Sequence, residues 1–462
     1  MSLLRKKDVS VMMDMKQHSK LARHLSGFDL ILLGIGAIIG TGIFVLTGTG
    51  ALYAGPALPI SFIISAVVCA LAALCYAEFS SMIPVSGSVY TYTYATIGEV
   101  VAWIIGWCLI LEYGLASSAV ATGWSGYFQS LLAGFGLHLP TALTAAPGAV
   151  PGSETFFNLP AFLILMVITL LLSLGIKETK RVNNIMVLVK VAVVVLFIVV
   201  GIWYIEPGNY KPFAPFGMSG VLQASAIAFF AYLGFDAVTS AAEEVKNPGR
   251  NLPIGILGSL AIVTVLYVVV SAIMVGIVPF KQFEGVDSPV SLALKVAGQD
   301  WVAGFVDLGA IVGMTTVILV MTFGLVRLLF AMSRDGLLPK VFSDVNEKSH
   351  TPVKATWILG TTAGLIAGFV PLGTLAELIN IGTLAAFSLI SIAVIVLRRT
   401  RPDLKRAFKV PFVPVLPILS VLACIMLMFN LQPFTWIAFF VWTAIGLLLY
   451  FGYGRKRSKL HQ

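Results

Sequence analysis

The sequence predicts an all-α integral membrane protein, and two features of its composition point there first. Of the 462 residues, 58% are hydrophobic and only 11% are charged. The mean hydropathy is +0.96, a value that excludes an ordinary soluble domain. A third observation is that apolar runs recur along the whole chain, with no linker that would separate soluble domains. We therefore expect nearly the whole chain to lie in the membrane.

Twelve membrane spans are expected, because each spanning helix needs about 20 apolar residues. The ninth expected span is short, whereas the third and eighth are long enough to tilt or to extend into the cytoplasm. No small-residue cleavage pattern follows the first apolar run, so we read it as a retained span. The expected spans are residues 28–52, 56–80, 97–129, 159–176, 183–204, 220–242, 254–278, 301–332, 355–370, 375–398, 413–430 and 434–453.

The positive charges gather on one side of the expected membrane. Alternate connections and both terminal segments hold most of the 30 lysines and arginines. The opposite side has only Lys211, Lys281 and Lys295. This asymmetry follows the positive-inside rule, so both termini should be cytoplasmic and the number of spans even. The net charge of +9 therefore reflects orientation and contact with anionic membrane lipid, not nucleic acid.

A weak internal repeat divides the chain. An offset of 190 residues pairs Gly40 with Phe230 and Lys190 with Asn380. Because each unit has five spans, the second copy must lie inverted relative to the first, an arrangement that many transporters share. The expected parts are a cytoplasmic N-terminal segment 1–27, repeats 28–204 and 220–398, two further spans in 413–453, and a cytoplasmic tail 454–462.

The first span carries a Gly40-Thr41-Gly42 sequence at mid-depth, which predicts a broken helix. A break within the membrane is tolerated only against protein or a water-lined cavity. The amides of Thr41, Gly42 and Ile43 would then form a site of carboxylate size at the positive end of a half-helix. The alternative is that the glycines form a small-residue helix-packing stripe. The first interpretation predicts a transporter whose substrate has a carboxylate.

The sixth span has a less obvious break. Gly234 is a weak point, and Asp236 would suit the first turn of a new half-helix. Carbonyls of Phe230, Ala231 and Leu233 would face a substrate ammonium, and the Phe230 ring would close the pocket. The alternative is a packing glycine, a hydrogen-bonded buried acid and lipid-facing aromatic residues.

Three separate motifs resemble signatures of the amino acid–polyamine–organocation (APC) transporter superfamily. Leu111-Glu112-Tyr113 in the third span makes its cationic amino acid transporter branch the most similar. The resemblance extends from about residue 27 to 412. The three motifs are Gly34-x-Gly36-x-x-x-Gly40-Thr41-Gly42-Ile43-Phe44, Phe229 to Asp236 with Ala242-Glu243-Glu244-Val245-Lys246-Asn247-Pro248, and Arg327-x-x-x-Ala331-Met332-Ser333-Arg334-Asp335-Gly336-Leu337-Leu338-Pro339.

The resemblance implies a LeuT-like 5+5 inverted repeat with two additional C-terminal helices. It also implies alternating-access transport of L-amino acids. Met321 in the eighth span would favour small or medium apolar side chains, although ordinary core packing accounts for it equally well. The expected substrate-binding residues are Ile38, Ile39, Gly40, Thr41, Gly42, Ile43, Phe230, Ala231, Leu233 and Met321.

Lys190 is the one lysine near the middle of an expected span, where a bare charge is expensive. The resemblance implies that a lysine here takes the place of a sodium ion between the first and eighth helices, so Lys190 is a candidate proton carrier. The alternatives are a static ion pair, for example with Glu112, or a snorkelling side chain. Glu112 is a candidate proton relay, gate or recognition site for a cationic side chain. Glu78 is expected to be structural, whereas Tyr113 and Asn380 are weaker cavity candidates.

The expected function is proton-coupled uptake of L-amino acids across the plasma membrane by a secondary active transporter. Small neutral substrates such as alanine are favoured, with broad specificity and with the proton as the coupling ion. No metal-ligand spacing, histidine cluster, nucleophile–base pair or nucleotide motif supports an enzyme or a cofactor. Alternatives are a cationic amino acid transporter, an amino acid exchanger, and a nutrient sensor or channel with the same fold.

Overall fold

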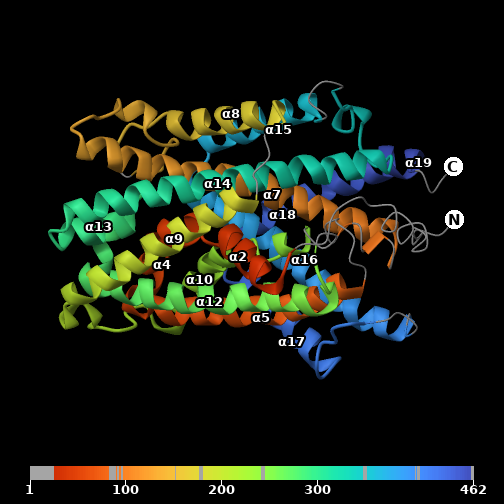
Figure 1. Cartoon of the computed structure of the whole chain (residues 1–462), viewed down its shortest axis with the longest axis horizontal. Coiled ribbons are helices and arrows are strands. Elements are labelled where there is room, and N and C mark those ends of the chain that lie inside the picture. The colour runs from red at the N-terminus through yellow and green to blue at the C-terminus, as the bar shows by residue number, and fades with distance from the viewer. Residues whose placement is uncertain are drawn as a thin grey trace.

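The computed structural model describes residues 25–82, 90, 93–94, 97–150, 152–175, 180–240, 245–346, 351–400, 402 and 406–458. All regular secondary structure in these residues is helical, and one isolated backbone bridge joins Leu25 to Val245. Most of the expected N-terminal segment, residues 1–24, lies outside the described residues. Figure 1 shows the long helices running roughly along the longest axis of the molecule. The predicted all-α membrane architecture is confirmed at this level.

Seven helical segments of the described chain are long and apolar enough to cross a membrane. Five shorter apolar helices lie in the remaining predicted spans. The long segments centre on α5 (Leu58–Met82), α7 (Glu99–Gly134), α9 (Lys180–Gly201), α12 (Pro248–Ile277), α14 (Asp300–Arg334), α16 (Leu372–Thr400) and α18 (Pro433–Leu449). The shorter helices are α2 (Gly27–Ile38), α8 (Leu159–Ser173), α10 (Gly217–Ala228), α15 (Val353–Phe369) and α17 (Val415–Met428).

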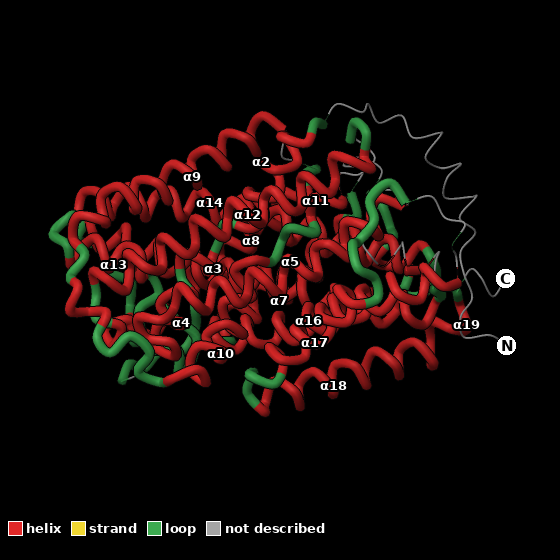
Figure 2. The backbone as a smooth tube through the Cα atoms, turned by 90° about the horizontal axis from the view of Figure 1, so that it is seen from below, coloured by secondary structure: helices red, strands yellow, loops and turns green. Residues whose placement is uncertain are grey.

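The helices pack in layers. α8 and α15 lie side by side on one face, and α5 and α12 lie side by side on the opposite face (Figure 1). α2 and α9 lie between these faces in Figure 1, whereas α18 runs along the periphery in Figure 2. Leu163, Val167 and Leu170 on α8 are each about half exposed, as expected for a helix that contacts lipid chains.

The connection between α12 and α14 contains a helix that the sequence analysis did not predict. This helix, α13, spans Pro289–Val296, with proline at its first position, where the missing amide hydrogen costs nothing. Its eight residues are too short to register as an apolar span. It lies at the end of the molecule opposite α19 (Arg455–Arg457) in Figure 1.

The first predicted break is present. α2 ends at Ile38, Ile39 is extended, and α3 (Thr41–Phe44) begins after Gly40. α4 (Leu46–Ala54) continues the second half of the span after an irregularity at Val45. The second half-helix therefore starts in the interior of the protein, with Thr41, Gly42 and Ile43 buried.

The second break is also present, with different geometry. α10 passes into a 3₁₀ turn, η5 (Phe229–Tyr232), and the chain then becomes extended at Leu233. Gly234 has φ of +111°, a conformation that side-chain-bearing residues rarely adopt. α11 (Ala237–Ser240) follows, and the Asp236 carbonyl accepts a hydrogen bond from the Thr239 amide at 2.8 Å. Gly234 is thus the weak point that the sequence indicated, and Asp236 lies just before the new helix and not in its first turn.

Glu78 has the structural role expected of it. Its carboxylate is buried and accepts two hydrogen bonds from Arg398, at 3.0 and 2.5 Å. The Val410 amide donates to the same carboxylate at 2.6 Å, and Arg406 lies 3.4 Å away. Because both oxygens have charged donors, Glu78 ties α5 to the end of α16 and is unavailable to a substrate.

Candidate functional site

The two breaks meet in the interior and contact each other reciprocally. A Cβ atom added to Gly42 would lie 2.2 Å from the Cα of Ala231, and one added to Gly234 would lie 2.7 Å from the Ala37 carbonyl oxygen. In each break, a glycine therefore packs directly against the backbone of the other broken span. Only glycine allows backbones to approach this closely, which fixes the relative position of the four half-helices.

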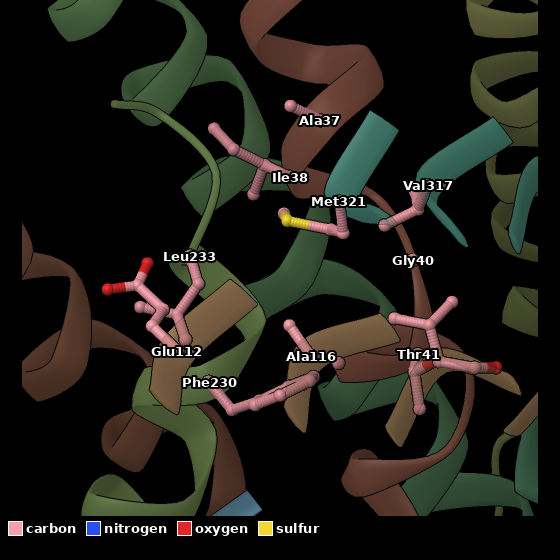
Figure 3. Close-up of a pocket in the computed structure, with 12 residues that line it drawn as sticks. Ala37, Ile38, Gly40, Thr41, Glu112, Ala116, Phe230, Leu233, Val317 and Met321 are labelled. Atoms are coloured by element: carbon pink, nitrogen blue, oxygen red, sulfur yellow. The ribbon is translucent and has the colours of Figure 1, made fainter. Parts of the chain in front are cut away.

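A pocket lies where the breaks meet. Together with its opening to solvent, it encloses about 360 Å³ of space that no atom of the protein fills. Figure 3 shows side chains from α2, the first break, α7, the second break and α14 around this space. The lining residues are Ala37, Ile38, Gly40, Thr41, Gly42, Glu112, Ala116, Val120, Phe230, Leu233, Val317 and Met321. The walls are mostly apolar, so an apolar side chain fits them, and Glu112 is the one acid among them.

The first break supplies hydrogen-bond donors to this pocket. The first helical bond of α3 joins the Phe44 amide to the Gly40 carbonyl at 3.3 Å. The amides of Thr41, Gly42 and Ile43 precede it, and they have no hydrogen bond to any described residue. Thr41 and Gly42 line the pocket. The start of α3 therefore presents backbone donors, which suit an anion.

The second break supplies carbonyl oxygens and an acid. The Leu233 amide donates to the Phe230 carbonyl at 3.2 Å, a bond that leaves a carbonyl oxygen able to accept another. The Tyr113 hydroxyl donates to Asp236 Oδ2 at 2.8 Å. This bond ties α7 to the chain just before α11. The end of η5 has the negative character that suits an ammonium group.

Glu112 is almost completely buried, with 3% of its surface exposed. Its Oε2 atom has no hydrogen-bond partner among the described residues, and its carboxyl lies near Asp236 and Thr383. The sequence left open an ion pair between Glu112 and Lys190. The structure shows no such contact between these two described residues. Glu112 is thus a polar group in an apolar pocket wall, where an uncompensated charge is expensive.

Lys190 is fully buried in α9 and does not line the pocket. Its Nζ atom donates to the Gly36 carbonyl near the end of α2 at 2.6 Å. A Cβ atom added to Gly313 would lie 2.9 Å from Lys190 Cγ, so this glycine on α14 makes room for the lysine stem. The ammonium therefore lies between α2 and α14 and binds a carbonyl that the break at Ile39 leaves without its helical donor.

The structure gathers most, but not all, of the expected substrate-binding residues around the pocket. Ile39, Ile43 and Ala231 do not line it. Ile39 and Ile43 are buried against the protein core, and Ala231 is covered by Gly42. Their main chain shapes the breaks, whereas their side chains point elsewhere.

Tyr113 and Asn380 were candidates for the cavity wall, and neither lines it. Tyr113 is directed to Asp236 at a distance of 2.8 Å. Asn380 donates to the Ala226 carbonyl at 2.7 Å and to the Ile227 carbonyl at 3.5 Å. Both side chains hold the second break from outside the pocket.

Four lining residues were missed by sequence analysis: Ala37, Ala116, Val120 and Val317. Three of them could have been found from helical spacing. Glu112, Ala116 and Val120 follow one another at intervals of four on α7, and Val317 lies four residues before Met321 on α14. Residues spaced by four share one face of a helix, so the faces of Glu112 and Met321 predict these neighbours.

Comparison with known proteins agrees with this arrangement. The sequence model of the amino acid permease family matches residues 25–450. The chain is 62% identical over 462 residues to the branched-chain amino acid permease BcaP of Bacillus subtilis, covering 100% of this chain and 99% of the relative. It is 57% identical, over all of both chains, to the methylthioribose transporter of the same species. Cationic amino acid transporter 4, vacuolar, of Arabidopsis thaliana is 40% identical over 87% of this chain and 68% of its own length.

These relatives are named as permeases and transporters, not as enzymes. The family match covers the breaks, the pocket and nearly all described helices. The chain therefore belongs to the amino acid permease family, within the APC superfamily of integral membrane transporters.

Proposed function

We propose that the protein is a secondary active transporter that takes up neutral L-amino acids together with protons. The observation that carries this proposal is the meeting of the two breaks at one pocket, with amides of Thr41 and Gly42 on one side and the end of η5 on the other. A zwitterionic amino acid has the two charges that these termini favour. Binding both charges through the main chain would give broad specificity.

The pocket walls favour apolar side chains. Ile38, Ala116, Val120, Val317 and Met321 offer no cation and no hydrogen-bonding group beyond a thioether sulfur. Alanine fits this lining, and so do the branched-chain amino acids that the name of the 62% identical relative specifies. We therefore propose substrates that extend from alanine to valine, leucine and isoleucine. Among amino acids, the cationic ones are less favoured substrates than the neutral ones, because the Met321 side chain has no group that would pair with a guanidinium.

The proposed architecture is twelve spans, a LeuT-like inverted repeat of five helices, and two further helices. Its support is a pair of matching hydrogen bonds. Lys190 Nζ binds the Gly36 carbonyl, and Asn380 Nδ2 binds the Ala226 carbonyl. Both residues of the second bond lie 190 positions after those of the first, the offset found in the sequence. The same offset relates α9 to α16 and α2 to α10. The distribution of basic residues supports cytoplasmic termini, and the proposed location is the plasma membrane.

Proton coupling is proposed through Lys190. A fully buried ammonium beside a half-helix end can hold or lose a proton, and its loss would weaken the bond to Gly36. Glu112, in the pocket wall, is the proposed second site in the proton path. Neither group needs a metal or an organic cofactor for this role.

A candidate substrate of another chemical class is methylthioribose, because the relative named as its transporter is 57% identical over the whole chain. This sugar derivative has an apolar methylthio group that would suit Met321 and Val317. It has no carboxylate for the amides of α3. The presence of those amides in the pocket wall favours an amino acid.

Competition for uptake tests the substrate. Purified protein in liposomes should take up labelled alanine or leucine, and unlabelled neutral amino acids should compete. Amino acids whose carboxylate is amidated or removed should compete at least about tenfold less well, because a charge-assisted hydrogen bond contributes about 1.5–3 kcal/mol. Strong competition by methylthioribose, or by simple amines, would contradict the proposed substrate.

A further inference from the structure

We propose that Asn380 is a positioning residue that holds the second break in place at every physiological pH. It is the neutral counterpart of Lys190, which holds the first break. The proposal deepens the proposed function, since it assigns a role in transport to a residue outside the pocket. It starts from the two equivalent hydrogen bonds. Lys190 binds the Gly36 carbonyl at 2.6 Å, and Asn380 binds the Ala226 carbonyl at 2.7 Å.

Both carbonyls lie at helix ends that lack helical donors. α2 ends at Ile38, so Gly36 has no helical amide four residues later to bind. α10 changes at Phe229 into a 3₁₀ turn, which alters the bonding of its last carbonyls, including those of Ala226 and Ile227. Such carbonyls need another donor when they are buried. In each copy of the repeat, one buried side chain from the fifth helix of that copy supplies it.

The two donors differ in chemistry. An ammonium group carries a proton that it can lose, and its bond is charge-assisted. A carboxamide keeps both of its N–H donors over the whole physiological pH range. The end of α2 is therefore held by a group that can respond to protons, whereas the end of α10 is held by one that cannot.

The surroundings of Asn380 support a role that does not change with pH. Asn380 is fully buried, and its two hydrogen bonds to described residues both go to main-chain carbonyls of α10. Its Oδ1 atom has no partner among the described residues, so no ionisable group there hydrogen-bonds this side chain. Buried ionisable side chains on the elements packed against α16 include Glu112 of α7, Cys69 and Tyr76 of α5, Tyr232 of η5 and Cys424 of α17.

This arrangement makes the two breaks functionally unequal. Loss of the Lys190 proton would free the end of α2, while Asn380 continues to hold the end of α10 against the pocket. The carbonyls after Ala226 then keep their position for the substrate ammonium through the whole cycle. Asn380 does not touch the substrate, and it acts through the backbone of α10.

The variant Asn380→Asp tests this role, because it keeps the size of the side chain and replaces the amide donors by a carboxyl. At low pH the introduced carboxyl has one O–H group that can donate to the Ala226 carbonyl. At high pH the carboxylate is only an acceptor and would repel the carbonyl. The second break should therefore become pH-sensitive in the variant, which a merely space-filling role would not produce.

Amide hydrogen exchange, measured by mass spectrometry without substrate, reports how firmly each break is held. In the wild type, raising the pH should increase exchange near residues 33–40 after correction for the intrinsic rate, and leave residues 224–233 unchanged. In Asn380→Asp, exchange at residues 224–233 should be about tenfold or more faster than in the wild type at high pH. At low pH it should equal the wild-type rate. Asn380→Gln, which keeps the donors, should remain close to wild type at both values.

Asn430→Asp is the matched control, since Asn430 donates to the Met426 carbonyl at 2.8 Å at the exposed end of α17. It should leave 224–233 unchanged. Equal exchange at 224–233 in Asn380→Asp and wild type at every pH would overturn the proposal, and so would an equal increase at every pH. Because this readout needs no transport, failure of amino acid uptake would contradict the proposed function and leave the role of Asn380 standing.

Discussion

The two breaks both interrupt a helix at the same pocket, but side chains of different chemistry hold them. The first opens the helix at Ile39 and Gly40 and presents the start of a half-helix to the pocket. The second tightens α10 into a 3₁₀ turn and presents the end of a helix. One is held by a charged ammonium from Lys190, and the other by the neutral amide of Asn380. The difference teaches that two similar helix breaks can be held by side chains of different chemistry.

The two ends have opposite polarity at the pocket, which accounts for how a single zwitterion can satisfy both. Amides at the start of α3 favour the carboxylate, and carbonyls at the end of η5 favour the ammonium. In the proposed binding mode, the side chain of the substrate meets walls supplied by α2, α7, α14 and the second break. Recognition of the common part of an amino acid is thereby separated from recognition of its side chain.

The largest expected effect comes from separating the two breaks. In Gly42→Val, the new side chain would meet the backbone of Ala231, where an added Cβ lies at 2.2 Å. Overpacking of this kind costs about 1–3 kcal/mol, which corresponds to about a 5- to 150-fold loss of uptake. Uptake and substrate binding should fall together in liposomes.

The control for this variant is Gly114→Ala, in the same part of the molecule on α7. A Cβ added to Gly114 has its nearest contact at 3.8 Å, with Leu325, an ordinary van der Waals distance. This variant should transport nearly as well as the wild type. Normal uptake by Gly42→Val would mean that the breaks need not touch.

The next effect concerns the wall that both breaks face. Met321 is 7% exposed and lines the pocket, and Met321→Ser should leave room for a longer side chain. One methylene of room is worth about 1–3 kcal/mol in discrimination, so competition by arginine should rise about tenfold or more. Alanine uptake should survive, because the ends of both breaks are unchanged. An unaltered substrate panel would show that side-chain selection lies elsewhere.

The smallest expected effect comes from loosening the second break alone. Tyr113→Phe removes the hydroxyl that binds Asp236 Oδ2 at 2.8 Å and keeps the ring. One hydrogen bond contributes about 0.5–1.5 kcal/mol, so uptake should fall about threefold at every pH. Tyr210→Phe is a suitable control, since Tyr210 binds the Ala272 carbonyl outside the pocket. A change in the pH profile of Tyr113→Phe would assign the bond to the proton path instead.

Much of the first break was readable from the sequence, because Gly40, Thr41 and Gly42 interrupt an apolar run at mid-depth and weaken the helix there. The second was only partly readable. Gly234 indicated it, but the 3₁₀ turn and the reciprocal contact of Gly234 with Ala37 depend on tertiary packing. The position of Lys190 between α2 and α14 agrees with the expected one, whereas the ion pair with Glu112 that the sequence left open is absent.

The pocket walls were harder to predict for a physical reason. In a chain that is hydrophobic throughout, periodicity does not separate residues facing lipid, core or cavity. Ala37 therefore resembles any other packing residue in the sequence, whereas Ala116, Val120 and Val317 are distinguished only by their helical spacing from Glu112 and Met321. Helix α13 was missed because it is short, and its apolar residues were indistinguishable from those of a loop that packs on the bundle.

Uptake driven by an imposed gradient tests the central claim most directly. Liposomes with an inward proton gradient and no sodium should accumulate labelled alanine or leucine above the outside concentration, and a protonophore should abolish the accumulation. Lys190→Met should lose this accumulation, because the buried ammonium at the end of α2 is the proposed proton carrier. Accumulation that follows a sodium gradient at fixed pH, or that persists unchanged in Lys190→Met, would contradict the account.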